Sequence, residues 1–506
     1  MGSYLYVILA YLLVLTGYNI YRSRQVKTQE DFMVAGRSLS LTKMVFTLVC
    51  TWIGSGTFIA GAEYASYAGW SAVWQPAGAF LGIAIIYFIA GRIRTFGQYT
   101  VGDILEVRYG RFARLFGAIA LIIAFTTIVS YQFRAGGYIL NVVSDGAVSL
   151  EMGQIIAAVF VILFVTIGGM VAVAHTDLPN GIIIVSACLL SFPFVVAAVG
   201  GREQAAAVLP AGHFEVFSPD FGRYPPLKAL AYFLSTLLLL LGVQSMYQKF
   251  YAAKSPRDAR QAVAIWIIGT IIVETIVIGI AVYAFAYGVK HGMNWDGRSL
   301  VLQAARHMVP GPVGVLLLGA ACAVVLSTGM NYLLSSSSNI IRDIYQKMVN
   351  PKADPTRMVA LQKVFIVAMG FCAFLMIFIP TVLESQISVL QYSYFAYTMY
   401  GVAVTPALFA ALTWKRATRA GGIASILGGA VATVFFEFVL PWIAPGVMQG
   451  AEGAGSVFGA DPWGIPSIYP AALISIGSLL IVSLLTPAPK QEELEPLFGL
   501  SMKCGP

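Results

Sequence analysis

Two neighbouring hydroxyl side chains in an apolar segment give the first sign of chemistry in this sequence. Ser327 and Thr328 lie three and four residues after Val324, so all three share one face of the helix expected over 311–341. A second segment, 51–57 (TWIGSGT), places two glycines inside an expected helix, where unwinding would release backbone carbonyls. By analogy with other hard cations, sodium requires about five or six oxygen ligands, which two hydroxyls and several freed carbonyls would supply.

Both patterns also have a structural interpretation. Serine and threonine in membrane helices often hydrogen-bond to their own backbone, and glycines allow helices to pack closely. The four serines 335–338, two turns beyond Thr328, could line an exit path for the ion or could simply pack at a helix crossing. From the residues alone, these alternatives remain open.

Arg134, in the segment YQFRAGG, is the basic residue that falls well inside an expected membrane span. A charge within a bilayer is costly and points to function by default. A guanidinium could hold a substrate carboxylate through two parallel hydrogen bonds. The structural alternative is an internal salt bridge to Glu63 or Glu274.

Asp177 lies at the start of another expected span. It could cap that helix from the cytoplasmic side, or it could stabilise sodium on an inward exit path. Glu274 and Glu437 are also deep in spans, and each could bind a proton, pair with a cation or face a helix groove. Neither receives a mechanistic role from the sequence.

The elements that must position these residues are membrane helices. The chain has 506 residues, of which 58% are hydrophobic and only 11% charged, too few charges to cover the surface of soluble domains. At about 20 apolar residues per crossing, 13 spans are expected near 3–21, 41–68, 70–91, 115–143, 153–175, 177–199, 225–248, 261–289, 311–341, 360–380, 386–413, 419–443 and 466–486. No P-loop, HExxH motif or nucleophile elbow is present, so no enzyme activity is predicted.

The distribution of basic residues predicts the orientation. Most of the 31 Lys and Arg residues fall on one side of the expected spans, in the segments 22–43, 92–114, 249–260, 342–363, 415–419 and the tail from 487. Basic loops stay preferentially cytoplasmic, so the N-terminus is expected outside and the C-terminus inside the cell membrane. The net charge of +8 is then explained by topology and by affinity for anionic lipid rather than for nucleic acid.

A second interruption is expected in the span 225–248, where Ser235, Thr236, Gly242, Gln244 and Ser245 surround a leucine run. It follows the first interruption by five helices. Paired interruptions at corresponding positions of two halves are typical of inverted-repeat transporters. The two halves would be 41–199 and 225–413.

Several segments together resemble the sodium:solute symporter family. They are DFMVAGRSLS (31–40), TWIGSGTFIAGAEYASYAGW (51–70), TIGGMVAVAHTD (166–177), GVQSMYQKFYAAKSPRDA (242–259) and the Ser-Thr pair 327–328 followed by RDIY (342–345). The resemblance implies an all-α integral membrane protein with a 5+5 inverted-repeat, broken-helix (LeuT-type) core. It also implies sodium-driven uptake by alternating access.

The resemblance further implies a set of sodium ligands at Cys50, Ile53, Val324, Ser327 and Thr328, with the first three contributing backbone oxygens. Some members hold a second sodium through further hydroxyls just after this pair. Here those positions read Gly329, Met330 and Asn331. One sodium ion per solute is therefore expected.

For the solute, the resemblance implies that Arg134 faces a carboxylate and that Thr57, Gln75 and Gln244 are neutral contacts. The expected function is sodium-coupled import of a small polar organic solute, carboxylate-bearing and either anionic or zwitterionic, with no obligatory protein partner. A proton-coupled transporter using Glu63, Glu274 or Glu437 is the alternative, as is a transporter-like channel or solute sensor. The chain is expected to form a single transmembrane domain, divided into a leading helix and loop (1–40), a ten-helix core (41–413), two trailing helices (414–486) and a loosely ordered cytoplasmic tail (487–506).

Overall fold

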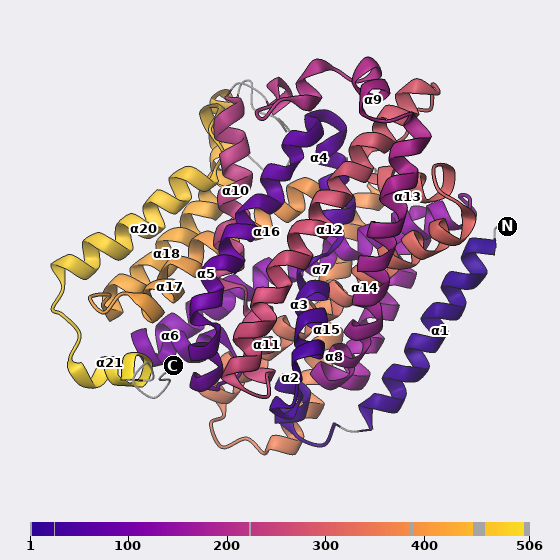
Figure 1. Cartoon of the computed structure of the whole chain (residues 1–506). Coiled ribbons are helices and arrows are strands. Elements are labelled where there is room, and N and C mark those ends of the chain that lie inside the picture. Colours follow the sequence, from indigo (N-terminus) through magenta and orange to yellow (C-terminus); the bar gives the residue numbers. More distant parts are fainter. Residues whose placement is uncertain (1–2, 25, 222–223, 384–387, 449–460, 500–506) are drawn as a thin grey trace.

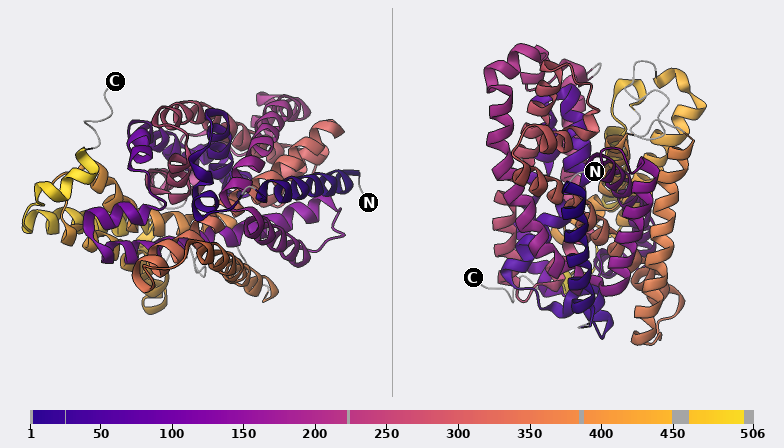
Figure 2. Two further views of the ribbon diagram at one scale, coloured as in Figure 1. Left: turned by 90° about the horizontal axis from the view of Figure 1, so that it is seen from below. Right: turned by 90° about the vertical axis from the view of Figure 1, so that its right-hand side faces the viewer.

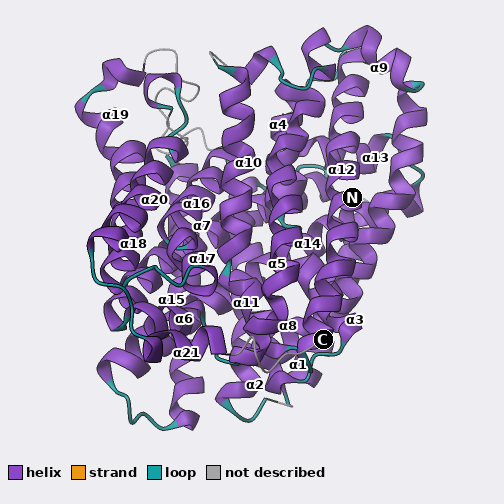
Figure 3. Ribbon diagram, turned by 60° about the vertical axis from the view of Figure 1, so that its left-hand side comes forward, coloured by secondary structure: helices purple, strands orange, loops and turns teal. Residues whose placement is uncertain are grey.

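The computed structural model describes residues 3–24, 26–221, 224–383, 388–448 and 461–499. Within these ranges the regular structure is helical and no strand is present (Figure 3). The α-helices are α1 (Ser3–Ser23), α2 (Gln29–Val34), α3 (Leu41–Trp52), α4 (Gly61–Ala68), α5 (Trp74–Phe96), α6 (Val101–Tyr109), α7 (Arg111–Val143), α8 (Leu150–Val199), α9 (Arg202–Val208), α10 (Pro225–Gly242), α11 (Gln244–Ala252), α12 (Pro256–Lys290), α13 (Leu300–His307), α14 (Gly311–Ser338), α15 (Pro355–Val382), α16 (Val389–Ala403), α17 (Thr405–Thr413), α18 (Arg419–Val434), α19 (Leu440–Ile443), α20 (Ile468–Leu485) and α21 (Gln491–Phe498). Shorter tight or wide helical segments are η1 (Ala35–Arg37), η2 (Gly56–Ala60), η3 (Gly69–Val73), η4 (Ala211–Phe214), η5 (Pro219–Phe221), η6 (Gly297–Ser299), η7 (Asn339–Val349), η8 (Phe435–Val439), η9 (Pro445–Met448) and η10 (Pro462–Gly464).

Eleven helical stretches among the described residues are long and apolar enough to cross a membrane. Two of them, Gly56–Phe96 with 41 residues and Leu150–Val199 with 50, are longer than one crossing needs. Each is interrupted by a glycine at positive φ, Gly69 (58°) or Gly169 (51°). The boundary expected near residue 176 is therefore wrong, because the chain turns earlier, at Gly169. The total of 13 spans stays a prediction.

Only glycine fits the turn at position 169. Its φ lies in the left-handed region, and a Cβ there would lie 2.7 Å from the ring of Phe32. The turn therefore depends both on backbone freedom and on the absence of a side chain. It separates two parts of α8, each long enough for one crossing.

The first core helix is broken in its middle. Helix α3 ends at Trp52, and Ile53 adopts an extended conformation (φ −73°, ψ 102°) before the chain resumes as η2 and α4. The side-chain oxygen of Gln132 on α7 accepts the N–H of Ser55 at 3.3 Å. A neighbouring helix thus supplies a partner for a backbone group that the break leaves exposed.

A second core helix is broken in the same way. Helix α10 ends at Gly242, Val243 leaves the helical conformation (φ −58°, ψ 113°), and α11 follows directly. The hydroxyl of Tyr247 donates to the carbonyl of Leu241 at 2.9 Å, and the hydroxyl of Tyr400 donates to the carbonyl of Gly242. The paired interruptions predicted from the sequence are confirmed.

The leading and trailing helices flank the core on opposite sides. Helix α1 lies at one edge of the bundle, and α18 and α20 lie at the other, both in the side view (Figure 1) and from below (Figure 2). Within the core, α14 packs against α7 and α8, and α10 packs against α5 and α16. The second broken helix thus packs against α5 and α16.

A buried ionic cluster joins α6, α7 and η7. Arg114 of α7 pairs with Asp103 and, at 3.1 Å, with Glu106, while Arg342 lies 3.4 Å from Asp103. Burial alone would raise the pKa of Asp103, but attraction to Arg114 and Arg342 outweighs it and lowers the pKa below its ordinary value. Asp343 completes the cluster by accepting a hydrogen bond from Thr100 at 2.7 Å.

The C-terminal tail is more ordered than expected. Helix α21 packs back on the bundle, where Arg92 donates to the carbonyl of Leu497 at 3.1 Å. Arg419 pairs with Glu493 of the same helix at 2.9 Å. The expectation of a loosely ordered tail is therefore wrong for this helix, and residues 500–506 lie outside the described residues.

Candidate functional site

The hydroxyls of α14 meet the break of the first core helix, as the sequence predicts. The Oγ1 of Thr328 lies 3.2 Å from the carbonyl oxygens of both Cys50 and Ile53. The Oγ of Ser327 lies 3.3 Å from the carbonyl oxygen of Cys50. Four oxygens of the type that sodium prefers therefore converge where α3 ends and α14 crosses it.

A glycine makes this approach possible. A Cβ at Gly54 would lie 2.9 Å from the methyl group of Thr328 and 3.0 Å from its hydroxyl oxygen. Any larger residue would push α14 away from the freed carbonyls. The glycine run of the predicted break thus serves both the break and the close crossing.

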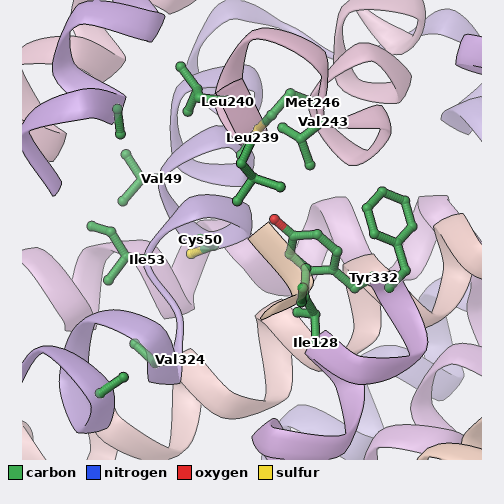
Figure 4. Close-up of a cluster of buried hydrophobic side chains, with 14 of the residues drawn as sticks. Val49, Cys50, Ile53, Ile128, Leu239, Leu240, Val243, Met246, Val324 and Tyr332 are labelled. Carbon is green, nitrogen blue, oxygen red and sulfur yellow. The ribbon is translucent and has the colours of Figure 1, made fainter. Parts of the chain in front are cut away.

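The remaining predicted ligand, Val324, is buried one helical turn before Thr328. The apolar side chains of Cys50, Ile53 and Val324 lie near one another around the crossing (Figure 4). Apolar side chains suit positions that would contribute only backbone oxygens, because they exclude water from the site. As an ion ligand, Val324 stays a prediction.

Asp177 lies directly beside the crossing. Its Oδ1 accepts the hydroxyl of Ser327 at 2.5 Å, and its Oδ2 accepts the hydroxyl of Thr47 at 2.5 Å. It lies within α8, several residues after the turn at Gly169, so the helix-capping alternative is wrong. The carboxylate is instead hydrogen-bonded directly to Ser327, a predicted sodium ligand.

Sequence reasoning missed a buried lysine in this region. Lys249 of α11 falls within the segment 249–260, which we expected to be a cytoplasmic loop, yet it has no exposed surface. Its ammonium donates to the Oδ1 of Asn331, whose Nδ2 donates to Asp177 at 3.4 Å. Lys249 and Asp177 also attract each other electrostatically. Its burial could have been predicted from the sequence, because Lys249 follows the predicted break in the span 225–248 by only a few residues.

A small cavity lies beside the first break. Two of the predicted solute contacts, Thr57 and Gln75, line it. Glu274 of α12 and the aromatic residues Trp52 and Tyr397 also line it.

Only one of the two carboxylate oxygens of Glu274 has a hydrogen-bond partner among the described residues. Its Oε1 accepts the hydroxyl of Thr57 at 3.0 Å. Its Oε2 is buried and has no hydrogen-bond partner among the described residues. The indole of Trp52 lies close enough to stabilise the carboxylate weakly. The cavity therefore contains an acidic oxygen that is free to bind a ligand.

The structure does not bring Arg134 to this cavity. Its Nη1 donates to the hydroxyl of Thr381 at 2.8 Å, and its guanidinium lies 5.3 Å from the ring centre of Tyr138. The alternative of a salt bridge to Glu63 or Glu274 is wrong.

Glu63 pairs instead with Arg298 at 3.1 Å and also accepts the backbone N–H of Leu390 at 3.3 Å. Because attraction to this carboxylate outweighs burial, the pKa of Arg298 is raised above its ordinary value.

Gln244 is likewise engaged elsewhere. Its Oε1 accepts the N–H of Val101 at 3.2 Å, and its Nε2 donates to the carbonyl of Ser335 at 3.2 Å. Both ends of its amide therefore hold helices together, and Gln244 as a solute contact stays a prediction.

The serines 335–338 are buried and contact neighbouring glutamines. Ser335 donates to the Oε1 of Gln248 at 2.6 Å, while Gln362 donates to Ser338 at 3.0 Å. These contacts favour the helix-crossing interpretation in this conformation. Glu437, the remaining deep acid, accepts a hydrogen bond from Ser467.

Taken together, these features define a class of protein. A broken helix, crossed by a hydroxyl-bearing helix beside a small central cavity and matched by a second broken helix, defines a secondary transporter of the inverted-repeat type. The chain belongs to the sodium:solute symporter family, whose model matches residues 32–429. Members of this family couple sodium to the transport of a small solute and are transporters rather than enzymes.

Relatives of known function match nearly the whole chain. It is 25% identical to the high-affinity proline transporter PutP of Bacillus subtilis, over 95% of this chain and 97% of that protein. It is 25% identical to the sodium/pantothenate symporter of Escherichia coli, over 84% and 88% of the two chains. It is also 25% identical to the human high affinity choline transporter 1, over 79% and 70%.

Solved structures show the same fold. A Na⁺-coupled sialic acid symporter superposes with a TM-score of 0.77 at 18% identity, covering 97% of this chain and 99% of that one. The nucleobase-cation-symport transporter Mhp1 superposes with a TM-score of 0.58 at 12% identity, over 92% and 97% of the two chains. The all-α, LeuT-type broken-helix fold predicted from the sequence is therefore confirmed.

Proposed function

We propose that this protein imports a small polar organic solute across the cell membrane, driven by one sodium ion that binds where α3 breaks and α14 crosses it. The observation that carries the proposal is the convergence of the Ser327 and Thr328 hydroxyls on the carbonyls of Cys50 and Ile53. The carbonyl of Val324 would complete the ligand set. Neutral oxygens bind the ion without the tight hold of a carboxylate cage, which suits a site that must release it.

The position of the cavity supports coupling between ion and solute. Thr57 lines the cavity, and it follows the break at Ile53 by only a few residues. Sodium that fixes the break would also fix the cavity wall and so raise affinity for the solute. Linkage requires the solute to raise sodium affinity by the same factor.

The basic segments support an orientation with the N-terminus outside and the C-terminus inside. A transport domain formed by the whole chain, with its ten-helix core at 41–413, agrees with the family match over 32–429. Asp177, which accepts a hydrogen bond from Ser327, would be the first carboxylate that an inward-moving ion meets. Alternating access would release both ligands to the cytoplasm.

The class of solute follows less directly. The relatives named above transport proline, pantothenate and choline, which are all small and polar. The carboxylate-bearing solute expected from the sequence rests on Arg134. That residue does not line the cavity, so the expectation would require a conformation in which Arg134 turns towards the solute.

A proton-coupled mechanism is the second candidate, because Glu274 places a buried carboxylate in the cavity. Glu63 is less suited to this role, since it is paired with Arg298. The two mechanisms differ in the ion that drives uptake. They can therefore be separated by imposing one gradient at a time.

Uptake into proteoliposomes tests the proposal. Radiolabelled proline, choline and pantothenate would be offered under an inward sodium gradient, under a proton gradient without sodium, and with potassium on both sides. We expect concentrative uptake of at least one solute only with sodium. Equal accumulation in potassium buffer, or uptake that follows the proton gradient alone, would overturn sodium coupling.

A further inference from the structure

The cavity beside the first break contains a buried carboxyl group that no cationic side chain among its described lining residues balances. Glu274 is 3% exposed, and its Oε2 has no hydrogen-bond partner among the described residues. The described residues that line the cavity include no lysine, arginine or histidine. A buried carboxylate is strongly destabilised unless a cation or several hydrogen bonds compensate it.

The neighbours of Glu274 orient it for a ligand. Thr57 donates to Oε1 at 3.0 Å, which fixes the plane of the carboxylate and leaves Oε2 free. Both groups line the cavity with Trp52 and Tyr397. A carboxylate beside aromatic rings is the usual recognition site for an organic ammonium group, which gains a charge-assisted contact and cation–π attraction.

Gln75 adds a neutral polar contact to the same wall. Its amide lines the cavity and is 6% exposed, and its backbone carbonyl accepts the hydroxyl of Thr236 at 2.6 Å. The helix that carries Gln75 is therefore fixed against α10 while the side chain remains available. The cavity thus offers one acidic oxygen, one amide and aromatic surface, but no cationic side chain.

We propose that Glu274 binds a positively charged nitrogen of the transported solute, so that the cargo is an organic ammonium compound: an amine, an amino acid or a quaternary ammonium ion. This inference rests on the proposed function, since it places the solute in the cavity beside the sodium site. It places the charged contact of the solute at Glu274 rather than at Arg134. A second sodium ion at Glu274 is the competing occupant and is an outcome of the test.

Equilibrium binding to purified wild-type protein tests the charge preference directly. Choline and its neutral carbon isostere, dimethylbutanol, have nearly the same shape but differ in charge. We expect choline to compete for the site at least ten times more strongly than the isostere, and proline to compete more strongly than pantothenate, which has no ammonium group. Equal competition within the choline pair, or tighter binding of pantothenate than of proline and choline, would overturn the proposal.

The variant Glu274→Gln tests the residue. We expect it to weaken binding of the ammonium solute at least tenfold while leaving the sodium concentration for half-maximal thermal stabilisation unchanged. Glu437→Gln, the same substitution at a buried acid away from the cavity, should leave solute binding unchanged. Unaltered ammonium binding in Glu274→Gln, or an altered sodium response with solute affinity intact, would overturn the proposal, the second result by assigning the carboxylate to sodium.

The same measurements separate this inference from the proposed function. Binding in potassium buffer reports on Glu274 even if transport proves independent of sodium. Loss of ammonium selectivity with sodium coupling intact would refute the inference alone. If Glu274→Gln does not fold, the competition between choline and its isostere on the wild-type protein still decides.

Discussion

Asp177 and Glu274 are two buried carboxylates in the same transport core, yet their surroundings differ. Both oxygens of Asp177 accept hydrogen bonds, from Ser327 and Thr47. A buried ammonium, Lys249, is joined to it through Asn331. Glu274 has one hydroxyl partner, Thr57, and a second oxygen that faces the cavity without one.

The two carboxylates differ in whether the protein itself supplies a nearby positive charge. Beside the proposed sodium site, the protein supplies a positive charge of its own, Lys249, close to the acid Asp177. At Glu274 no lining side chain among the described residues supplies such a charge, so we expect the ligand itself to bring it. Lys249 places a positive charge near Asp177, and neither Met330 nor Asn331 carries a hydroxyl.

Removing Lys249 should have the largest effect on stability and uptake. Without its ammonium group, Asp177 would have no nearby positive charge, as is the case for Glu274. Breaking a buried charge pair from one side costs about 3–5 kcal/mol, so Lys249→Met should markedly lower the melting temperature and abolish uptake. Lys249→Arg keeps the charge and should retain most stability. The measurement is thermal unfolding of the purified protein together with sodium-driven uptake.

The double variant Asp177→Asn with Lys249→Met provides the control. If the two groups are coupled, the second substitution should recover part of the stability lost by the first, with an interaction energy of about 0.5–3 kcal/mol. Additive losses would show that Asp177 and Lys249 act independently. The contrast between the two carboxylates would then need another explanation.

Thr328→Ala should have an intermediate effect confined to sodium. It removes a hydroxyl that lies 3.2 Å from two freed carbonyls, and we expect the sodium concentration for half-maximal uptake to rise about tenfold, or about 1.4 kcal/mol. Ser338→Ala is the matched control on the same helix, because Ser338 donates to the carbonyl of Leu334 instead. An unchanged sodium response in Thr328→Ala would place the ion elsewhere.

The sequence predicted the fold and the meeting of Ser327 and Thr328 with the first break, because both depend on local signals. Glycines in an apolar run mark a break, and Ser327 and Thr328 share a helical face whatever surrounds them. The motif order then identified the family. Those signals act over a few residues and need no knowledge of which helices touch.

The cavity was harder to predict because its walls come from distant segments. Glu274 meets Thr57 across more than two hundred residues, and no local pattern pairs them. Arg134 and Gln244 were predicted as solute contacts because each is a polar side chain at membrane depth. In the structure each is hydrogen-bonded to other helices instead: Arg134 to Thr381, and Gln244 to Val101 and Ser335. Chemical type alone could not decide which buried polar groups face the solute.

Arg134→Gln should have the smallest effect on the solute. The substitution removes the hydrogen bond to Thr381, at a cost in stability of about 1 kcal/mol, but it removes no group from the cavity. We expect the KM for an ammonium solute to change by less than about threefold, which corresponds to under about 1 kcal/mol. The measurement is initial-rate uptake at saturating sodium, with Glu274→Gln assayed in parallel.

The opposite pattern would be equally informative. If Arg134→Gln abolished uptake of a carboxylate solute while Glu274→Gln left it intact, the guanidinium would have to reach the solute in a conformation where Thr381 no longer holds it. In that case neither Asp177 nor Glu274 would contact the solute, and Arg134 would bind its carboxylate. Assayed side by side, the two variants therefore separate an ammonium contact at Glu274 from a carboxylate contact at Arg134.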